Sequence, residues 1–274
     1  MALRLTFHMR QPFTKQLAIA EACRCGAGAL GIEVKVRDEF RRPEGDGLIL
    51  FGIGGENRAV YDAYRGAGLP VVFWDKGYMG RGAYYRVSVN EFQPHAYFQA
   101  VPRKPDRFLR LAIEPAPFRR RGSTILFDGA SQKYLSWQGL GQLEVWGAGV
   151  VATLRRHSRR QIVYRPRPTH NPEPHVPGAE RGAPELRREL ERAHLCVSYG
   201  GNIGVDALIA GVPHFALGDS IARPLSETNW RNLDQPHVPT DAERLQWLAD
   251  LAYCQWTMDE IASGEAWCYL EGRL

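Results

Sequence analysis

Short apolar runs alternate with helix-like stretches along the first third of the chain. Gly47–Ile53 and Pro70–Trp74 are almost wholly apolar, as strands of a parallel sheet are when helices cover both of its faces. Lys15–Leu30 and Glu56–Arg65 have the length and composition of helices. The pattern predicts strands at Leu3–His8, Ile32–Val36, Gly47–Ile53, Pro70–Trp74 and Arg86–Val89.

The alternation stops at residues 101–122, a stretch with four prolines and seven basic residues that is typical of a connection between domains. It then resumes, and the second half is expected to form the strands Thr124–Phe127, Gln161–Tyr164, Leu195–Ser198 and Pro213–Leu217. The helices expected there are Leu140–Arg156, Ala183–Ala193, Ile203–Ala210, Asp241–Tyr253 and Met258–Ala262. The sequence therefore predicts an α/β protein of two Rossmann-like, doubly wound parallel-sheet domains, 1–122 and 123–274.

Composition narrows the class of protein further. With 274 residues, 44% of them apolar and 24% charged, the chain has the values of an ordinary globular protein, which excludes disorder and fibrous repeats. No run approaches 18 consecutive apolar residues, so no transmembrane helix is expected. Five cysteines without paired spacing favour free thiols in a reducing cytoplasm, and no metal site is predicted.

The net charge of +5 is distributed unevenly between the two predicted domains. Residues 1–122 carry 20 basic and 12 acidic side chains, whereas residues 123–274 carry 15 and 18. A basic domain suggests a polyanionic partner such as nucleic acid. An ordinary solvated surface accounts for the same numbers equally well.

The strongest local signal is the segment Leu195–Pro213, which reads as a strand, a glycine-rich turn, a short helix and a Gly-x-Pro opening another strand. Glycines let the backbone approach a ligand, and a helix start offers unpaired N–H groups to a phosphate. A plain strand–turn–helix with a glycine cap is the alternative. The candidate ligand-binding residues are Ser198, Gly200, Gly201, Asn202 and Asp206.

Two further loops follow strands of the same predicted sheet. Gly129, Ser131 and Lys133 come after the first strand of the second half, and Arg165 and Arg167 flank a proline after the next strand. These residue types suit phosphate recognition. Ligands bind at the carboxyl ends of strands in open α/β sheets, so the three loops are expected to converge on one edge.

The segment after Leu195 resembles the nucleotide-sugar signature of two-domain GT-B glycosyltransferases, in which a glycine-rich turn precedes acidic-Ala-Leu-x-x-Gly-x-Pro. The matching residues here run from Asp206 to Pro213. The resemblance implies a fold with two sheet domains facing a cleft. It also implies that Gly200, Gly201 and Asn202 contact the donor diphosphate and that Asp206 binds its ribose. That family more often has Glu at this position. A UDP-sugar as co-substrate, with no cofactor, is what the resemblance implies.

The first half offers candidates for a catalytic base. Asp75 ends a buried strand beside aromatic residues and can act as general base on an acceptor hydroxyl, or simply cap the following turn. His8 ends the first strand and His95 begins a predicted helix, and either can be structural instead. Lys76, Tyr78 and Arg81 follow Asp75 in the sequence and are candidates for holding the acceptor.

The basic first half favours DNA as the acceptor. Its small size and charge resemble those of phage DNA base glucosyltransferases, which implies transfer to a 5-hydroxymethylpyrimidine of double-stranded DNA by a monomer in the cytoplasm of an infected bacterium. A surface-polysaccharide glycosyltransferase and a non-catalytic nucleic-acid-binding protein are the alternatives. The remaining candidate DNA-binding residues are Arg103, Lys104, Arg107, Arg119, Arg120 and Arg121.

Overall fold

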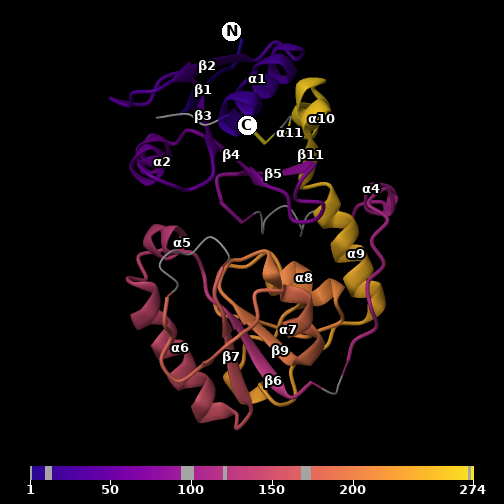
Figure 1. The fold of residues 1–274 in the computed structure, drawn as a ribbon. Helices are drawn as coiled ribbons and strands as arrows, with labels where there is room; N and C mark the ends of the chain where they lie inside the picture. Colours follow the sequence, from indigo (N-terminus) through magenta and orange to yellow (C-terminus); the bar gives the residue numbers. More distant parts are fainter. Residues whose placement is uncertain (1, 10–13, 94–101, 120–121, 168–173, 271–272) are drawn as a thin grey trace. The chain divides into compact units, whose positions relative to one another are not determined.

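The computed structural model describes residues 2–9, 14–93, 102–119, 122–167, 174–270 and 273–274. They form two units, each built around its own sheet (Figure 1). Unit 1 comprises Met1–Leu111 together with Ala249–Leu274, and unit 2 comprises Ala112–Leu248. Among the helices described, none has the length and apolar character needed to cross a membrane.

Unit 1 contains a six-stranded sheet in the order β11-β5-β4-β3-β1-β2. The strands from β2 to β4 run parallel, whereas β5 is antiparallel to β4 and β11 is antiparallel to β5. Its strands are β1 Arg4–His8, β2 Glu33–Arg37, β3 Gly47–Phe51, β4 Val71–Lys76, β5 Tyr84–Val89 and β11 Gln255–Thr257. Its helices are α1 Thr14–Gly28, α2 Asn57–Gly66, α4 Asp106–Leu109, α10 Met258–Ala262 and α11 Glu265–Leu270.

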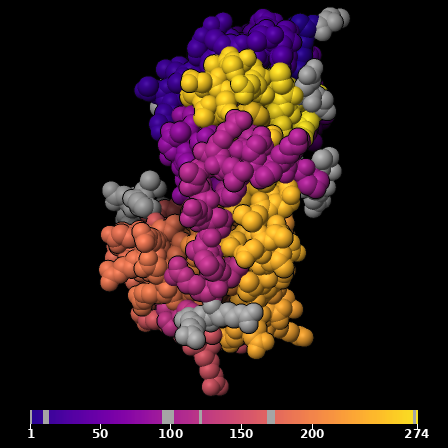
Figure 2. All heavy atoms as spheres, turned by 90° about the vertical axis from the view of Figure 1, so that its right-hand side faces the viewer, coloured from indigo at the N-terminus to yellow at the C-terminus, as the bar shows by residue number. Residues whose placement is uncertain are grey.

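The C-terminal segment packs into unit 1 rather than into the second half of the chain. Ile19 and Cys23 of α1 share one apolar core with Ile261 and Trp267, and Figure 2 shows the yellow C-terminal residues set against the indigo N-terminal ones. A Cβ added at Gly26 would lie 1.8 Å from the carbonyl oxygen of Ile261. Glycine at this position therefore permits the close approach of α1 and α10.

Unit 2 contains a five-stranded, all-parallel sheet in the order β10-β9-β6-β7-β8. Its strands are β6 Thr124–Asp128, β7 Gln161–Arg165, β8 Glu180–Arg181, β9 Ala193–Ser198 and β10 His214–Ala216. Its helices are α5 Gln132–Trp137, α6 Leu143–His157, α7 Leu186–Arg192 and α8 Ile203–Ile209, with short 3-10 turns at Arg223–Leu225 and Trp230–Asn232. α9 (Asp241–Ala252) carries the chain from unit 2 back to unit 1.

The unit boundaries differ from the sequence prediction of 1–122 and 123–274. Residues 112–119 belong to unit 2, where Arg244 donates hydrogen bonds to the carbonyl oxygens of Ala116 and Leu208. The last 26 residues belong to unit 1, because β11 extends its sheet and α10 packs on α1. The two-sheet α/β architecture itself is confirmed, with β5 and β11 as antiparallel additions.

Candidate functional site

The carboxyl ends of β6, β7 and β9 lie side by side in unit 2. In the sheet register the last residue of β6, Asp128, is paired with Arg165 of β7 and with Ser198 of β9. The loops that follow these strands carry the ligand-binding residues predicted from the sequence. The sheet therefore brings together the starts of all three loops, as expected for open α/β sheets.

A buried ion pair lies at the centre of this edge. Arg165 Nη1 donates to Asp128 Oδ1 at 3.1 Å, and both side chains are almost fully buried. Arg165 also donates from Nε and Nη2 to the carbonyl oxygen of Pro184. Burial raises the pKa of Asp128, although the charges of Arg167 and Arg165 favour its ionised form. Three donors of Arg165 are thus occupied within the unit, so its position is fixed by the fold.

Arg167 is a cation of this edge that is available to a ligand. It is half-buried, and no hydrogen bond joins its side chain to another residue in the described part of the chain. Its Nη2 atom lies 3.2 Å from the place that a Cβ would occupy at Gly201, and Asp128 Oδ2 lies 3.8 Å from the same point. The guanidinium of Arg167 is therefore held over the glycine turn, where it can contact an anion.

The glycine turn requires glycine for two reasons. Gly200 has φ +65°, in the left-handed region, and a Cβ there would lie 1.9 Å from the ring of Tyr134. Tyr134 in turn donates from its hydroxyl to the carbonyl oxygen of Asp219. The turn is thus packed tightly against α5 and leads directly into α8, whose first turn contains Asp206. Asn202 and Asp206 are half-buried at this helix start.

The three predicted residues that follow β6 lie in different surroundings. The hydroxyl of Ser131 caps α5 by accepting from the backbone N–H of Tyr134 at 3.2 Å. Lys133 is exposed on α5. Gly129 packs under Tyr164, since a Cβ there would lie 2.7 Å from that ring. Ser131 therefore has a structural task, and its role in binding phosphate stays a prediction.

Ser198 belongs to a buried hydrogen-bond chain that the sequence did not reveal. Its hydroxyl lies 2.8 Å from His214 Nε2, and His214 Nδ1 lies 2.7 Å from the hydroxyl of Ser226. Ser226 donates to the carbonyl oxygen of Ala222. Burial lowers the pKa of His214 to about 3, so the imidazole is neutral and Ser198 donates to it. Ser198 thus orients β9 against β10.

In unit 1, Asp75 lies near the end of β4 and is held by Arg86, which no sequence motif indicated. Arg86 Nη2 donates to Asp75 Oδ2 at 3.1 Å, and the backbone N–H of Lys76 donates to Oδ1 at 2.8 Å. The Asp75 side chain is 30% exposed and that of Arg86 is 7% exposed. Asp75 thus presents its carboxylate to solvent in a fixed orientation.

Hydrogen bonds of the C-terminal segment hold the loop after Asp75 in place. The buried side chain of Gln255 accepts from the backbone N–H groups of Tyr78 and Met79, each at 2.9 Å, and donates to the Met79 carbonyl. Tyr78 is itself buried, and burial raises the pKa of its phenol. Lys76 and Arg81 are exposed, so they are the predicted acceptor residues of this loop that a ligand can reach.

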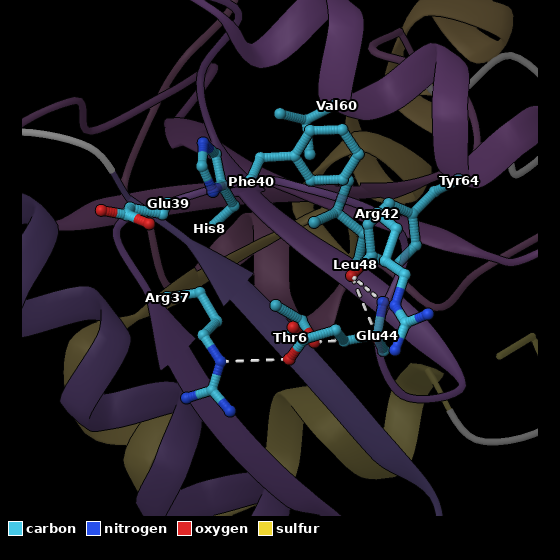
Figure 3. A pocket seen from close by; sticks show the side chains of 10 residues that line it. All are labelled: Thr6, His8, Arg37, Glu39, Phe40, Arg42, Glu44, Leu48, Val60 and Tyr64. Carbon is cyan, nitrogen blue, oxygen red and sulfur yellow. Dashed lines mark hydrogen bonds and ion pairs between the residues drawn. The ribbon is translucent and has the colours of Figure 1, made fainter.

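His8 lies at the carboxyl end of β1, where it lines a small pocket of unit 1 (Figure 3). It is 2% exposed, and the ring of Phe40 packs edge-on against it with 6.2 Å between centroids. On the other side of the pocket Arg37 is paired with Glu44, as Figure 3 shows. His95 lies outside the described residues. A role for His8 or His95 as base stays a prediction.

The predicted DNA-binding arginines lie in different surroundings. Arg107 is buried in unit 1, where it forms two hydrogen bonds with Glu260 and its guanidinium lies 4.0 Å from the ring centroid of Trp256. The guanidinium of Arg103 lies over Tyr253 and Tyr269, and Lys104 is exposed. Arg119 is exposed in unit 2, and residues 120–121 lie outside the described part. The fold thus occupies Arg107 internally and does not present it as a DNA contact.

The charge asymmetry of the sequence disappears when charges are counted over the units. Unit 1 has 18 basic and 16 acidic side chains, and unit 2 has 17 and 14. The sequence division placed the acidic C-terminal segment in the second domain and the arginines of residues 112–122 in the first. In the structure the C-terminal segment belongs to unit 1 and those arginines belong to unit 2. Neither unit is strongly basic, so the charge argument for DNA loses its basis. In the described parts of both units, no cluster of three or more His, Cys, Asp or Glu side chains is suited to a metal ion.

The fold has counterparts among solved structures, although no protein-family model and no curated protein sequence matches the chain. The beta Kdo 2,4 transferase of Thermosulfurimonas dismutans KpsC is 12% identical, with a TM-score of 0.53 over 94% of this chain and 92% of that one. The beta Kdo 2,7 transferase of the same KpsC is also 12% identical, with a TM-score of 0.52 over 98% and 99%. These likenesses confirm a fold of the GT-B glycosyltransferase type.

Proposed function

We propose that this chain is a glycosyltransferase that moves a sugar from a nucleotide-activated donor to a hydroxyl group of a glycan. The observation that carries the proposal is the carboxyl edge of the unit 2 sheet. There Arg167 lies over the Gly200–Asn202 turn in a fold of the GT-B type. A guanidinium and a glycine turn suit an anionic phosphate, and Asp206 at the start of α8 suits a ribose hydroxyl.

The chemistry of the transfer needs a base and positive charge. The acceptor hydroxyl attacks the anomeric carbon, the bond from that carbon to the phosphate oxygen breaks, and the nucleotide leaves with the electron pair. The proton of the hydroxyl passes to Asp75, which Arg86 orients. Arg167 stabilises the negative charge that develops on the leaving phosphate, assisted by Lys133. No cofactor is required for these steps.

The donor and the acceptor are proposed at different levels of detail. The resemblance of the glycine turn and α8 to the nucleotide-sugar signature favours a UDP-sugar, and the structural neighbours, being Kdo transferases, make a nucleotide-activated Kdo the second donor to test. A surface-polysaccharide glycan is the acceptor we favour. DNA carrying a 5-hydroxymethylpyrimidine is the alternative, supported by the exposed cations Lys76, Arg81 and Lys104. Action as a monomer in the bacterial cytoplasm stays a prediction.

A matrix of donors and acceptors tests the proposal. The protein is incubated with UDP-glucose or nucleotide-activated Kdo, and with a Kdo-containing oligosaccharide, 5-hydroxymethylated DNA or unmodified DNA. We expect nucleotide release with the oligosaccharide. Release only with 5-hydroxymethylated DNA would establish the alternative acceptor. Nucleotide binding without release in any combination, or no nucleotide binding at all, would overturn the proposal and favour a non-catalytic binding protein.

A further inference from the structure

Four exposed arginines gather at the amino-terminal edge of the unit 2 sheet. We call them the amino-edge arginines: Arg119, Arg156, Arg159 and Arg192. Arg192 directly precedes β9, Arg159 lies two residues before β7, and Arg156 is in the last turn of α6. The backbone N–H of Arg119 donates to the carbonyl oxygen of Gly211, close to the start of β10.

The sheet register holds these segments together. Thr124, the first residue of β6, is paired with Gln161 of β7 and with Ala193 of β9. The backbone N–H of Ser123 donates to the Arg192 carbonyl at 3.0 Å. Neighbouring strands lie about 4.8 Å apart, so the starts of β9, β6 and β7 span roughly 10 Å. In Figure 1 the start of β6 and the end of α6 lie at the same end of unit 2.

Neighbouring arginines are engaged within the unit, whereas the amino-edge arginines are not. Arg160 pairs with Asp234 and donates to the Gly122 carbonyl, and Arg155 donates to the Gly178 carbonyl. For the amino-edge arginines, no hydrogen bond or ion pair joins the side chain to another described residue. The helix dipole favours a cation in the last turn of α6 or α7. This accounts for Arg156 and Arg192 but not for Arg119 and Arg159, which lie outside helices.

This edge is opposite the one that carries Asp128 and Arg165, because all five strands of the sheet are parallel. The amino-edge arginines therefore do not belong to the proposed donor site. Arg119 was expected to contact an acceptor, yet it lies on this far edge. Exposed guanidinium groups without partners suit phosphate groups spread over a surface.

We propose that the amino-edge arginines dock unit 2 on a bilayer that contains anionic phospholipid. The edge presents the C-terminal ends of α6 and α7, whose carbonyl groups repel phosphate, so contact is made by long side chains alone. Nucleic acid is usually fixed in register by backbone N–H groups and helix N-termini in addition to side chains. Diffuse attraction to a charged lipid surface needs only clustered cations.

The strength of docking follows from the number of cations. Each basic residue near an anionic bilayer contributes about a fivefold increase in partitioning. Replacing three of the amino-edge arginines should therefore reduce partitioning roughly a hundredfold. The test variant is Arg156→Gln/Arg159→Gln/Arg192→Gln in the full chain. The matched control is Arg24→Gln/Arg41→Gln/Arg42→Gln, which removes three exposed positive charges from unit 1.

Sedimentation with vesicles measures the partitioning. We expect the wild-type protein to bind vesicles of phosphatidylglycerol and phosphatidylcholine at low salt, to ignore pure phosphatidylcholine, and to be released by high salt. The test variant should lose binding about a hundredfold, and the control variant should keep it within a few-fold. Equal losses in both variants, or no preference for phosphatidylglycerol in the wild type, would overturn the proposal.

Two further measurements separate this proposal from others. Short duplex DNA and additional phosphatidylglycerol vesicles are each added as competitors to the vesicle-bound protein. If DNA releases the protein at a lower phosphate concentration than the additional vesicles do, the edge binds nucleic acid and lipid docking is overturned. Nucleotide release with soluble substrates should be equal in the wild type and the test variant. If the wild type releases no nucleotide but binds vesicles as described, the proposed function fails while the docking surface stands.

Discussion

His214 gives unit 2 a stability that depends on pH. The ring is fully buried between Ser198 and Ser226, and in the folded protein its pKa is lowered from 6.5 to about 3 because burial disfavours the charged form. The unfolded chain binds a proton at His214 below pH 6.5, whereas the folded chain does not until about pH 3. The stability contribution is therefore complete above pH 6.5 and is lost as the pH falls.

The magnitude follows from the difference in proton binding. Well below pH 6.5 each pH unit removes about 1.4 kcal/mol, and His214 of the unfolded chain is half protonated at pH 6.5 itself, so the loss between pH 6.5 and pH 4.5 is about 2 kcal/mol. Urea unfolding followed by circular dichroism measures it in the wild type and in His214→Gln. His157→Gln, at an exposed histidine of the same unit, is the matched control.

We expect the wild type and the His157→Gln control to lose about 2 kcal/mol more than His214→Gln over this range, although His214→Gln is less stable at neutral pH. Other groups that titrate in this range affect all three proteins alike and cancel in the comparison. Curves of unfolding free energy against pH that run parallel for wild type and His214→Gln would contradict this expectation. They would show that His214 does not stay neutral between Ser198 and Ser226 in the folded protein.

The remaining predictions concern the two units in turn. Gly201→Ala should weaken nucleotide binding by up to about tenfold, measured calorimetrically, because the new Cβ lies 3.2 Å from Arg167 Nη2; Gly149→Ala, where a Cβ meets nothing within 4 Å, should leave binding unchanged. Arg107→Ala should destabilise unit 1 by about 3–5 kcal/mol in urea unfolding, because Glu260 loses its buried partner. A loss of stability below about 1 kcal/mol would contradict this expectation. Asp75→Asn should abolish transfer yet keep nucleotide affinity, whereas Asp62→Asn, at an exposed ion pair, should retain turnover.

The local parts of the fold could be predicted from the sequence. Apolar runs such as Gly47–Ile53 and Leu195–Ser198 are typical of buried strands, and each matches a strand of the structure to within a few residues. The convergence of three loops on one sheet edge also followed, because parallel strands place their carboxyl ends together. These inferences need only the near neighbours of each residue.

The long-range parts could not be predicted in the same way. Gln255–Thr257 reads as a short strand or turn by itself, and nothing nearby indicates that it pairs with β5 of unit 1. Gly26 has no local role in α1, and its importance lies in the approach of Ile261. Because the C-terminal segment was assigned to the wrong unit, the charge difference between domains was an artefact of the division.

The candidate site shows the same limit. Asp128 ends a buried strand as Asp75 does, so the signal that singled out Asp75 was also present there. Its partner Arg165 was proposed as a phosphate ligand, yet the fold uses three of its donors internally. In the sequence α8 separates Ser198 from His214, and Ser226 follows only after β10 and a 3-10 turn. The spacing of these residues therefore does not indicate their hydrogen bonds.

Nucleotide binding to Arg167→Gln tests whether the carboxyl edge of the unit 2 sheet holds the nucleotide of a sugar donor. UDP and CMP are titrated calorimetrically into the wild type, into Arg167→Gln and into Arg159→Gln, whose arginine lies on the opposite edge. We expect that the wild type binds at least one of them, that Arg167→Gln binds it about tenfold more weakly or worse, and that Arg159→Gln binds it unchanged. Binding of neither nucleotide, or equal binding by all three proteins, would contradict this.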